Sequence, residues 1–209
     1  MNRYDKKKSK EFDMIAKTAF APIYPVIAQQ IVDRCGVRTG ICIDAGSGPA
    51  LLAIALTKMT ALKTYSMDSS EDMREIAAEN IGAEGLSDRI VTIRGDVQDM
   101  PFEDGFANLV VSRGSFFFWD DLVAAFKEIY RVLSLGGRAY IGGGFGNAEL
   151  RARAAEEMRK VDEKWEDGVK KRFEMCNAGR FHGIMRDAYI PDYEIIDDET
   201  GFWILFKKA

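Results

Sequence analysis

Short apolar runs alternate with helix-forming runs through the first two thirds of the chain, and this alternation is the strongest constraint on its fold. The apolar runs end in turn residues and are expected as strands at 41–45, 63–67, 90–94, 107–112 and 138–141. Helices are expected at 50–59, 69–83 and 122–133. We expect Gly136 and Gly137 to end the last of these helices. Such alternation is typical of a parallel sheet with helices on both faces.

The two ends of the chain depart from this alternation. Residues 12–35 form two apolar-faced helical stretches interrupted at Pro22 and Pro25, which we expect to pack over the edge of the sheet as a cap. A charged helix is expected over 148–165 and further helical segments up to about Tyr189. The last two strands, at 193–196 and 202–206 around Gly201, predict an antiparallel hairpin.

The predicted fold class is therefore α/β, a Rossmann-like three-layer sandwich. Its sheet has seven mostly parallel strands and a C-terminal antiparallel hairpin. We expect a single domain over 1–209 with three parts: an N-terminal helical cap (1–38), a ligand-binding core (39–146), and C-terminal helices with the hairpin (147–209).

Composition narrows the classes of partner. The chain has 29 basic and 33 acidic residues, a formal net charge of −4, which argues against non-specific nucleic-acid binding. No apolar stretch approaches the roughly 20 residues of a membrane span. Cys35, Cys42 and Cys176 lack ligand-like spacing and are expected as reduced thiols in a cytoplasmic protein. His182 is the only histidine, so no histidine-based metal site is expected, and we predict no metal.

The loop after the first predicted strand, Asp44-Ala-Gly-Ser-Gly48, is the most informative segment. Its two glycines let the chain turn sharply into a helix and bring backbone N–H groups close to a ligand. The positive end of that helix favours an anionic group. A Gly-x-Gly pair also occurs in purely structural turns, so the loop alone leaves both possibilities open.

Two further residues sharpen the choice of ligand. Leu51 stands where a dinucleotide-binding fingerprint needs glycine or alanine, which argues against NAD. Asp68 ends the second predicted strand, 24 residues after Asp44, where an acid can accept hydrogen bonds from both ribose hydroxyls. The alternative role of Asp68 is an N-cap for the next helix.

Five segments carry a family resemblance: 43–48, 67–73, 94–102, 107–112 and 128–137. Through them, residues 12 to about 145 resemble the class I S-adenosylmethionine-dependent methyltransferases, particularly the small-molecule group with ubiquinone/menaquinone-type enzymes. The resemblance implies S-adenosyl-L-methionine as cofactor. Two departures are the family's third glycine, here Ala50, and the usual proline before Gly136, here Leu135.

The resemblance also implies roles for individual residues. Gly46 and Gly48 would pass under the cofactor, and Asp68 would hold the ribose. Asp96 and the Val97 amide would read adenine, and Asp44 would orient the methionine amino end, partly through water. The full cofactor-binding set expected is Asp44, Gly46, Ser47, Gly48, Asp68, Ser69, Met73, Asp96, Val97 and Arg113.

The acceptor side is harder to assign. Phe117, Trp119, Phe145 and Tyr24 are candidates for the substrate pocket, with core filling as the alternative for each ring. Arg113 suits the cofactor carboxylate, an acidic acceptor or a structural ion pair.

No catalytic residue is assigned. His182 is either a general base or, in the blander interpretation, a surface or capping residue. The Gly-rich run 142–146 either lets the backbone approach a ligand closely or makes a mobile turn.

The sequence thus favours methyl transfer to an unidentified, small-molecule acceptor. The Asn/Asp-Pro-Pro-Tyr signature of enzymes that methylate amide or adenine nitrogens is absent from the fourth strand end. The alternative is a non-catalytic S-adenosylmethionine-binding regulatory or partner protein, and the oligomeric state is not predicted. Residues 1–25 are expected either as a lid that orders over the ligand or as a static cap.

Overall fold

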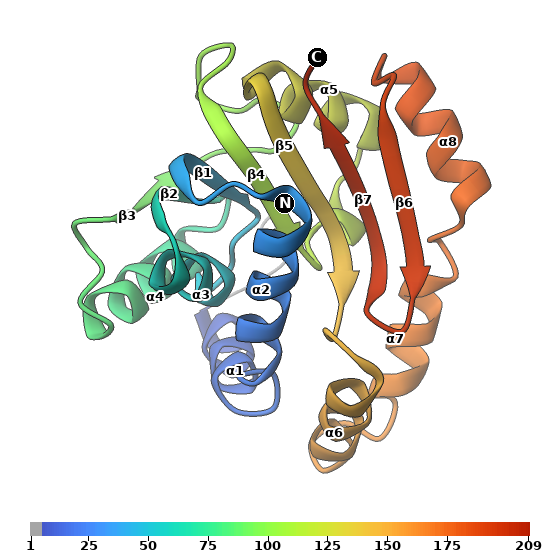
Figure 1. The fold of residues 1–209 in the computed structure, drawn as a ribbon. Coiled ribbons are helices and arrows are strands. Elements are labelled where there is room, and N and C mark those ends of the chain that lie inside the picture. Colours follow the sequence, from blue (N-terminus) through green and yellow to red (C-terminus); the bar gives the residue numbers. More distant parts are fainter. Residues whose placement is uncertain (1–5) are drawn as a thin grey trace.

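A computed structural model describes residues 6–209 of the chain (Figure 1). The α-helices are α1 (Lys6–Lys17), α2 (Ile23–Cys35), α3 (Leu51–Met59), α4 (Glu71–Ala83), α5 (Leu122–Val132), α6 (Ala148–Arg159), α7 (Trp165–Phe173) and α8 (Ala178–Asp187). The strands are β1 (Thr39–Ala45), β2 (Ala61–Asp68), β3 (Ile90–Arg94), β4 (Ala107–Arg113), β5 (Leu133–Gly144), β6 (Tyr193–Asp198) and β7 (Gly201–Lys207). A short 3₁₀ turn, η1 (Phe116–Phe118), follows β4.

The strands form one sheet in the order β3-β2-β1-β4-β5-β7-β6. The first five run parallel, and β7 pairs antiparallel with both β5 and β6. The predicted seven-stranded sheet with a C-terminal antiparallel hairpin is confirmed. The strand order reverses between β1 and β4, and ligands bind at such switch points in open α/β sheets.

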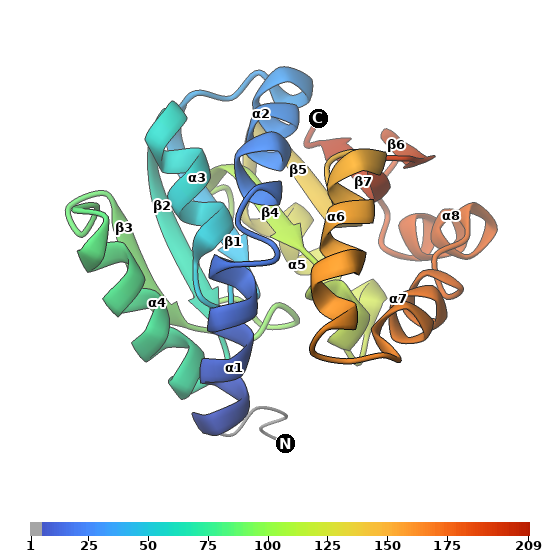
Figure 2. The same ribbon diagram turned by 90° about the horizontal axis from the view of Figure 1, so that it is seen from below.

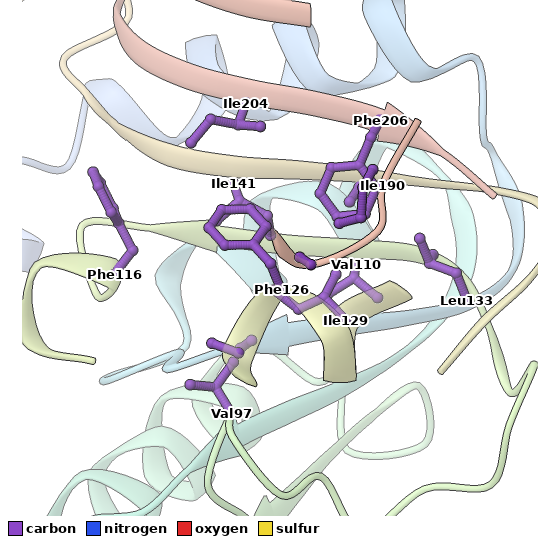
Figure 3. Packing of buried hydrophobic residues seen from close by; sticks show 14 of the residues in the cluster. Val97, Val110, Phe116, Phe126, Ile129, Leu133, Ile141, Ile190, Ile204 and Phe206 are labelled. Carbon is purple, nitrogen blue, oxygen red and sulfur yellow. The ribbon is translucent and has the colours of Figure 1, made fainter. Parts of the chain in front are cut away.

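Side chains alternate between the two faces of the sheet, and each face has its own apolar core. Val110 points into the cluster that includes Phe126 and Ile129 of α5 (Figure 3). Its neighbours Leu109 and Val111 point into the cluster formed with α2, α3 and α6. The three-layer arrangement follows from this division. Within residues 6–209, no helix combines the length and apolar character needed to cross a membrane.

The N-terminal helices differ from the expectation of an edge cap. Ile27 and Ile31 of α2 are fully buried in one cluster with Cys42 and Leu109, so α2 covers the face of the central strands. Pro25 lies inside the first turn of α2, where its missing N–H leaves no helical hydrogen bond unmade. Residues 1–5 of the predicted cap lie outside the described residues.

Two other boundaries were predicted wrongly. The helix over 122–133 ends at Val132 and passes directly into β5, so Gly136 and Gly137 lie inside a strand. Gly136 adopts a left-handed φ of 77°, and its N–H donates to the Lys208 carbonyl at 2.8 Å. The predicted charged helix over 148–165 ends at Arg159, and Trp165 begins a separate helix.

Candidate active site

The parallel strands bring the predicted polar residues to one edge of the sheet. Asp44 is the penultimate residue of β1, and Asp68 and Arg94 are the paired last residues of β2 and β3. Arg113 ends β4 opposite Gly142 of β5. Because parallel strands share a carboxyl edge, residues from four segments of sequence face one region.

The loop 46–50 is held against the end of β2. The N–H groups of Gly46 and Ser47 both donate to the Met67 carbonyl, at 2.8 and 3.0 Å. Gly46 has a φ of 70°, and a Cβ there would lie 2.5 Å from the Cβ and Oγ of Ser115. Glycine is therefore required by backbone conformation and by packing. Ala50, at the family's third glycine position, is also left-handed, with a φ of 65°.

Asp68 ties this loop to the start of α4. Its Oδ2 accepts the N–H of Gly48 and its Oδ1 the N–H of Ser70, both at 2.9 Å. Burial raises the pKa of Asp68 above its ordinary value, while these two amide hydrogen bonds act in the opposite direction. Ser70, the true N-cap of α4, receives the Met73 amide. Asp68 is thus free of the capping role that was its alternative.

Asp44 is the most unusual group in the site. It is 1% exposed, and its Oδ2 has no hydrogen-bond partner among residues 6–209. Burial raises the pKa of Asp44 to about 7, a hydrogen bond from the Ala53 amide opposes the rise, and the nearby charge of Asp68 adds to it. A buried carboxylate oxygen without a donor has the chemistry to receive an ammonium group from a ligand.

A single cavity of about 1000 Å³ contains these groups. All ten residues of the predicted cofactor-binding set line it, as do Tyr24 and Trp119 from the predicted acceptor pocket. It is lined further by Phe12, Pro49, Leu52, Met67, Ser70, Glu71, Arg74, Arg94, Gly95, Gln98, Gly114, Ser115, Phe118 and Asp120.

Two candidate acceptor residues lie elsewhere. Phe117 packs against Phe116 and Phe173, and neither Phe117 nor Phe145 lines the cavity. Phe118, which the sequence analysis did not single out, lines the cavity and is 41% exposed. The sequence does not distinguish the three consecutive phenylalanines 116–118, because the backbone of the turn η1 decides which ring faces the cavity.

Arg113 is enclosed by aromatic rings. Its guanidinium carbon lies 5.2 to 5.8 Å from the ring centroids of Phe20, Tyr24 and Phe145, and its Nε and Nη2 donate to the Gly144 carbonyl. Burial raises the pKa of Tyr24, whereas the Arg113 charge lowers it. Arg113 is thus a cation held by rings and a carbonyl at the wall of the cavity, an arrangement that differs from the structural ion pair that was one of its three alternatives.

The loop after β3 borders the other side of the cavity. Asp96 Oδ1 accepts the Gln98 amide at 2.9 Å, and Val97 is buried. Arg131 of α5 holds the same loop by donating to the Met100 and Phe102 carbonyls, and it forms a two-pronged ion pair with Glu128 at 2.7 Å. A helix far along the chain therefore fixes the loop that carries Asp96 and Val97.

His182 lies outside the cavity. It is on α8, where its Nδ1 is 2.7 Å from the Tyr193 hydroxyl, and it does not line the site. This placement favours the surface role among its two predicted alternatives.

Comparisons with known proteins identify the family of the chain. The methyltransferase-domain family matches residues 43–141. A Methanococcus maripaludis crystal structure, provisionally assigned as an S-adenosyl-L-methionine-dependent methyltransferase, is 47% identical with a TM-score of 0.95, covering 100% of this chain and 95% of that one.

Two curated relatives match over shorter stretches. The uncharacterized methyltransferase YdaC of Bacillus subtilis is 28% identical over 61% of this chain and 70% of its own length. The 2-methyl-6-phytyl-1,4-hydroquinone methyltransferase of Arabidopsis thaliana is 31% identical over 46% of this chain, and the match spans only 28% of that relative. The near full-length likeness to the Methanococcus maripaludis structure decides the family, and the chain belongs to the S-adenosylmethionine-dependent methyltransferases.

Proposed function

We propose that the cavity binds S-adenosylmethionine along the carboxyl edge of the sheet and that the methyl group passes to a small-molecule acceptor. In this arrangement Asp44 receives the methionine ammonium, Asp68 the ribose hydroxyls, and Asp96 with the Val97 amide the adenine. The observation that carries the proposal is the buried Asp44 Oδ2, which lacks a donor and lies in the same cavity as Asp68.

The charges of the site suit the charges of this cofactor. When bound, the cofactor supplies a methyl group made electrophilic by a sulfonium cation. Asp44 and Asp68 place carboxylates along the cavity. The positive N-terminus of α3 lies beside the glycine loop, where it can bind the carboxylate of the cofactor's methionine part. Arg113 offers a second place for the methionine carboxylate or for an acidic acceptor. The glycine loop leaves room for the cofactor to pass over its backbone.

An acceptor of small size fits the remaining space. About 1000 Å³ is at the upper end of small-molecule pockets, which leaves room for cofactor and acceptor together. Phe118 and Trp119, on and just after the turn η1, supply apolar rings to the cavity, and they position the acceptor. The Arabidopsis relative is named for methylation of a hydroquinone, which supports a small-molecule acceptor but does not select one.

The proposal includes a cytoplasmic location. Cys35, Cys42 and Cys176 are free and buried, as expected of thiols in a reducing compartment. The net charge of −4 supports an acceptor other than nucleic acid.

Two experiments test the proposal. Calorimetric titration is expected to show micromolar binding of S-adenosylmethionine and S-adenosylhomocysteine and no binding of NAD; NAD binding without sulfonium binding would refute it. Incubation with methyl-labelled cofactor and fractionated small-molecule extracts is expected to label a low-mass product. Label appearing only in protein or nucleic acid contradicts the small-molecule acceptor. Cofactor binding without turnover on any acceptor favours a non-catalytic regulatory or partner role.

A further inference from the structure

Asn80 of α4 joins two segments that border the cavity. Its Nδ2 donates to Asp13 Oδ1 of α1 at 2.8 Å and to the Pro49 carbonyl of the glycine loop at 2.9 Å. An amide nitrogen carries two N–H groups, and both are used here. Asn80 is only 5% exposed, so these hydrogen bonds form largely away from water.

Helix α1 also packs through apolar side chains, since Ala16 is buried in the cluster formed with α2 and α3 and Ile15 packs against that cluster. Of its twelve residues only Ser9 and Ala16 are buried, and α1 lies beside α4 in Figure 2. The Lys6–Glu75 ion pair between the two helices spans 3.9 Å at the surface, where such pairs contribute little. The Asn80–Asp13 hydrogen bond, in contrast, is a part-buried polar link between α4 and α1.

The docked helix covers the glycine loop. Phe12 of α1 lines the cavity, and its Cε1 lies 3.7 Å from the position of a Cβ on Gly48. On the other side of the loop, Asp68 Oδ2 accepts the Gly48 amide at 2.9 Å. The loop is thus fixed from two directions, by Asp68 and by Asn80 through Pro49.

We infer that Asn80 is a positioning residue that holds α1 and the glycine loop in one arrangement over the methionine end of the cofactor. The inference rests on the proposed function, because it takes the loop to be the cofactor loop. Breaking the Asn80 hydrogen bonds releases α1 and Phe12 and lets the loop relax, so cofactor affinity falls. Asn80 itself touches no ligand in this arrangement.

The structure offers a matched set of variants. Asn80→Asp keeps the shape but replaces both donors by acceptors that face the Asp13 and Pro49 oxygens. Asp13→Ala removes the acceptor on α1, whereas Asp13→Asn keeps an oxygen for Asn80. Lys17→Ala is the control, because Lys17 pairs with the other oxygen of Asp13, at 2.7 Å.

Hydrogen exchange without ligand and titration with S-adenosylhomocysteine test the inference together. For Asp13→Ala, we expect amides of residues 9–17 to exchange about tenfold faster and the Kd to rise about tenfold, the factor for the net loss of one hydrogen bond. Asn80→Asp loses two hydrogen bonds, so both effects should be at least as large. In Asp13→Asn and Lys17→Ala, the exchange rates and the Kd should stay within about twofold of the unmodified chain, because the hydrogen bond from Asn80 to residue 13 is kept.

Three results overturn the inference. The first is an Asp13→Ala variant with unchanged hydrogen exchange and unchanged affinity. The second is an equal loss of affinity in Asp13→Asn and Asp13→Ala. The third is faster hydrogen exchange in α1 with unchanged affinity for S-adenosylhomocysteine. If Asn80→Asp fails to fold, the comparison of Asp13→Ala with Asp13→Asn tests the inference alone, because Asp13 lies on the polar helix α1. If the unmodified chain binds no S-adenosylhomocysteine, the proposed site fails, whereas the exchange comparison still tests the docking of α1.

Discussion

At one end of the cavity, strand termini present carboxylates and backbone amides that already bond to one another, whereas the other end is lined by aromatic rings. Asp68 accepts two amides, and Gly46 is packed against Ser115. At the far end, Phe118 is 41% exposed and Trp119 is half-buried. The polar groups are held by hydrogen bonds between strand ends, whereas Phe118 and Trp119 follow β4 on the turn η1 and present partly exposed rings to the cavity.

This difference matches two separate roles, cofactor binding for the polar groups and acceptor binding for the aromatic rings. Preorganised polar groups lose little entropy on binding and recognise one ligand well, which suits a cofactor shared by every reaction of the family. A partly exposed aromatic surface tolerates changes of shape, which suits an acceptor that differs between relatives. Substitutions at the two ends should therefore separate cofactor affinity from acceptor use.

The largest effect is expected from Gly46→Val at the polar end. A branched side chain at a φ of 70° is strained and overlaps Ser115, so we expect S-adenosylhomocysteine affinity to fall by about 100-fold or more and stability by roughly 2–3 kcal/mol. Titration and denaturant unfolding measure the two effects. Gly85→Val is the matched control, since Gly85 has a φ of 68° and nothing within 4 Å of a Cβ. Normal affinity in Gly46→Val would place the cofactor elsewhere.

Asp68→Ala should have the next largest effect. Loss of a charged acceptor of two hydroxyl donors is expected to weaken S-adenosylhomocysteine binding by on the order of 2 kcal/mol, about 30-fold. The variant also frees the Gly48 and Ser70 amides, so a smaller loss of stability is expected. Asp72→Ala, in the first turn of α4 but outside the cavity, should bind normally. If Asp68→Ala and Asp72→Ala bound S-adenosylhomocysteine with equal affinity, Asp68 would not hold the ribose.

The raised pKa of Asp44, about 7, predicts a pH dependence of binding. The ionised carboxylate receives the ammonium, so lowering the pH from 8 to 6 should raise the Kd for S-adenosylhomocysteine about tenfold. Asp44→Asn should bind weakly at both values, with no such change. A tenfold change that persists in Asp44→Asn would assign the titration to another group.

The same shift affects the stability of the ligand-free protein. A carboxyl whose pKa is raised on folding binds a proton more tightly in the folded state. The free energy of unfolding should therefore decrease as the pH rises from about 4 to about 7, relative to Asp44→Asn. Denaturant unfolding of both proteins across this range would check the sign; an increase would mean that the pKa is lowered.

The smallest effect on cofactor binding is expected from Phe118→Ala at the aromatic end. Because Phe118 is partly exposed and follows β4, which lies two strands from the β2 strand that carries Asp68, affinity for S-adenosylhomocysteine should change by less than about twofold and stability by about 0.5 kcal/mol or less. The KM of the acceptor found by labelling should rise. A loss of cofactor affinity as large as that of Asp68→Ala would contradict the division of the cavity.

The sequence predicted the parts of this molecule that depend on local pattern. The strand Ile90–Arg94 was predicted to the residue, and the glycine loop from Gly46 to Gly48 was placed correctly between β1 and α3, because periodicity and turn chemistry act over short distances. Gly136 was expected to end a helix and instead lies in β5, because its partner, Lys208, lies about 70 residues away in the sequence.

The same distinction holds in the cavity. All ten residues of the cofactor set implied by the family resemblance line it, because the resembling segments lie at or just after the carboxyl ends of parallel strands. Arg113 contacts rings, and Asn80 contacts Asp13, from segments that are distant in the sequence. The sequence around Arg113 or Asn80 therefore does not indicate which residues it contacts. Phe118 rather than Phe117 lines the cavity because the turn η1 sets the direction of each ring.

A crystal structure with S-adenosylhomocysteine tests the central claim most directly, since it shows which end of the cavity holds the cofactor. The account predicts ribose hydroxyls at about 2.5–3.0 Å from the Asp68 carboxylate and the amino group at about 2.7–2.9 Å from Asp44, directly or through one water. The adenine should lie beside Asp96 and Val97. A cofactor seated against Phe118 and Trp119, with Asp44 Oδ2 still lacking a donor, would contradict it.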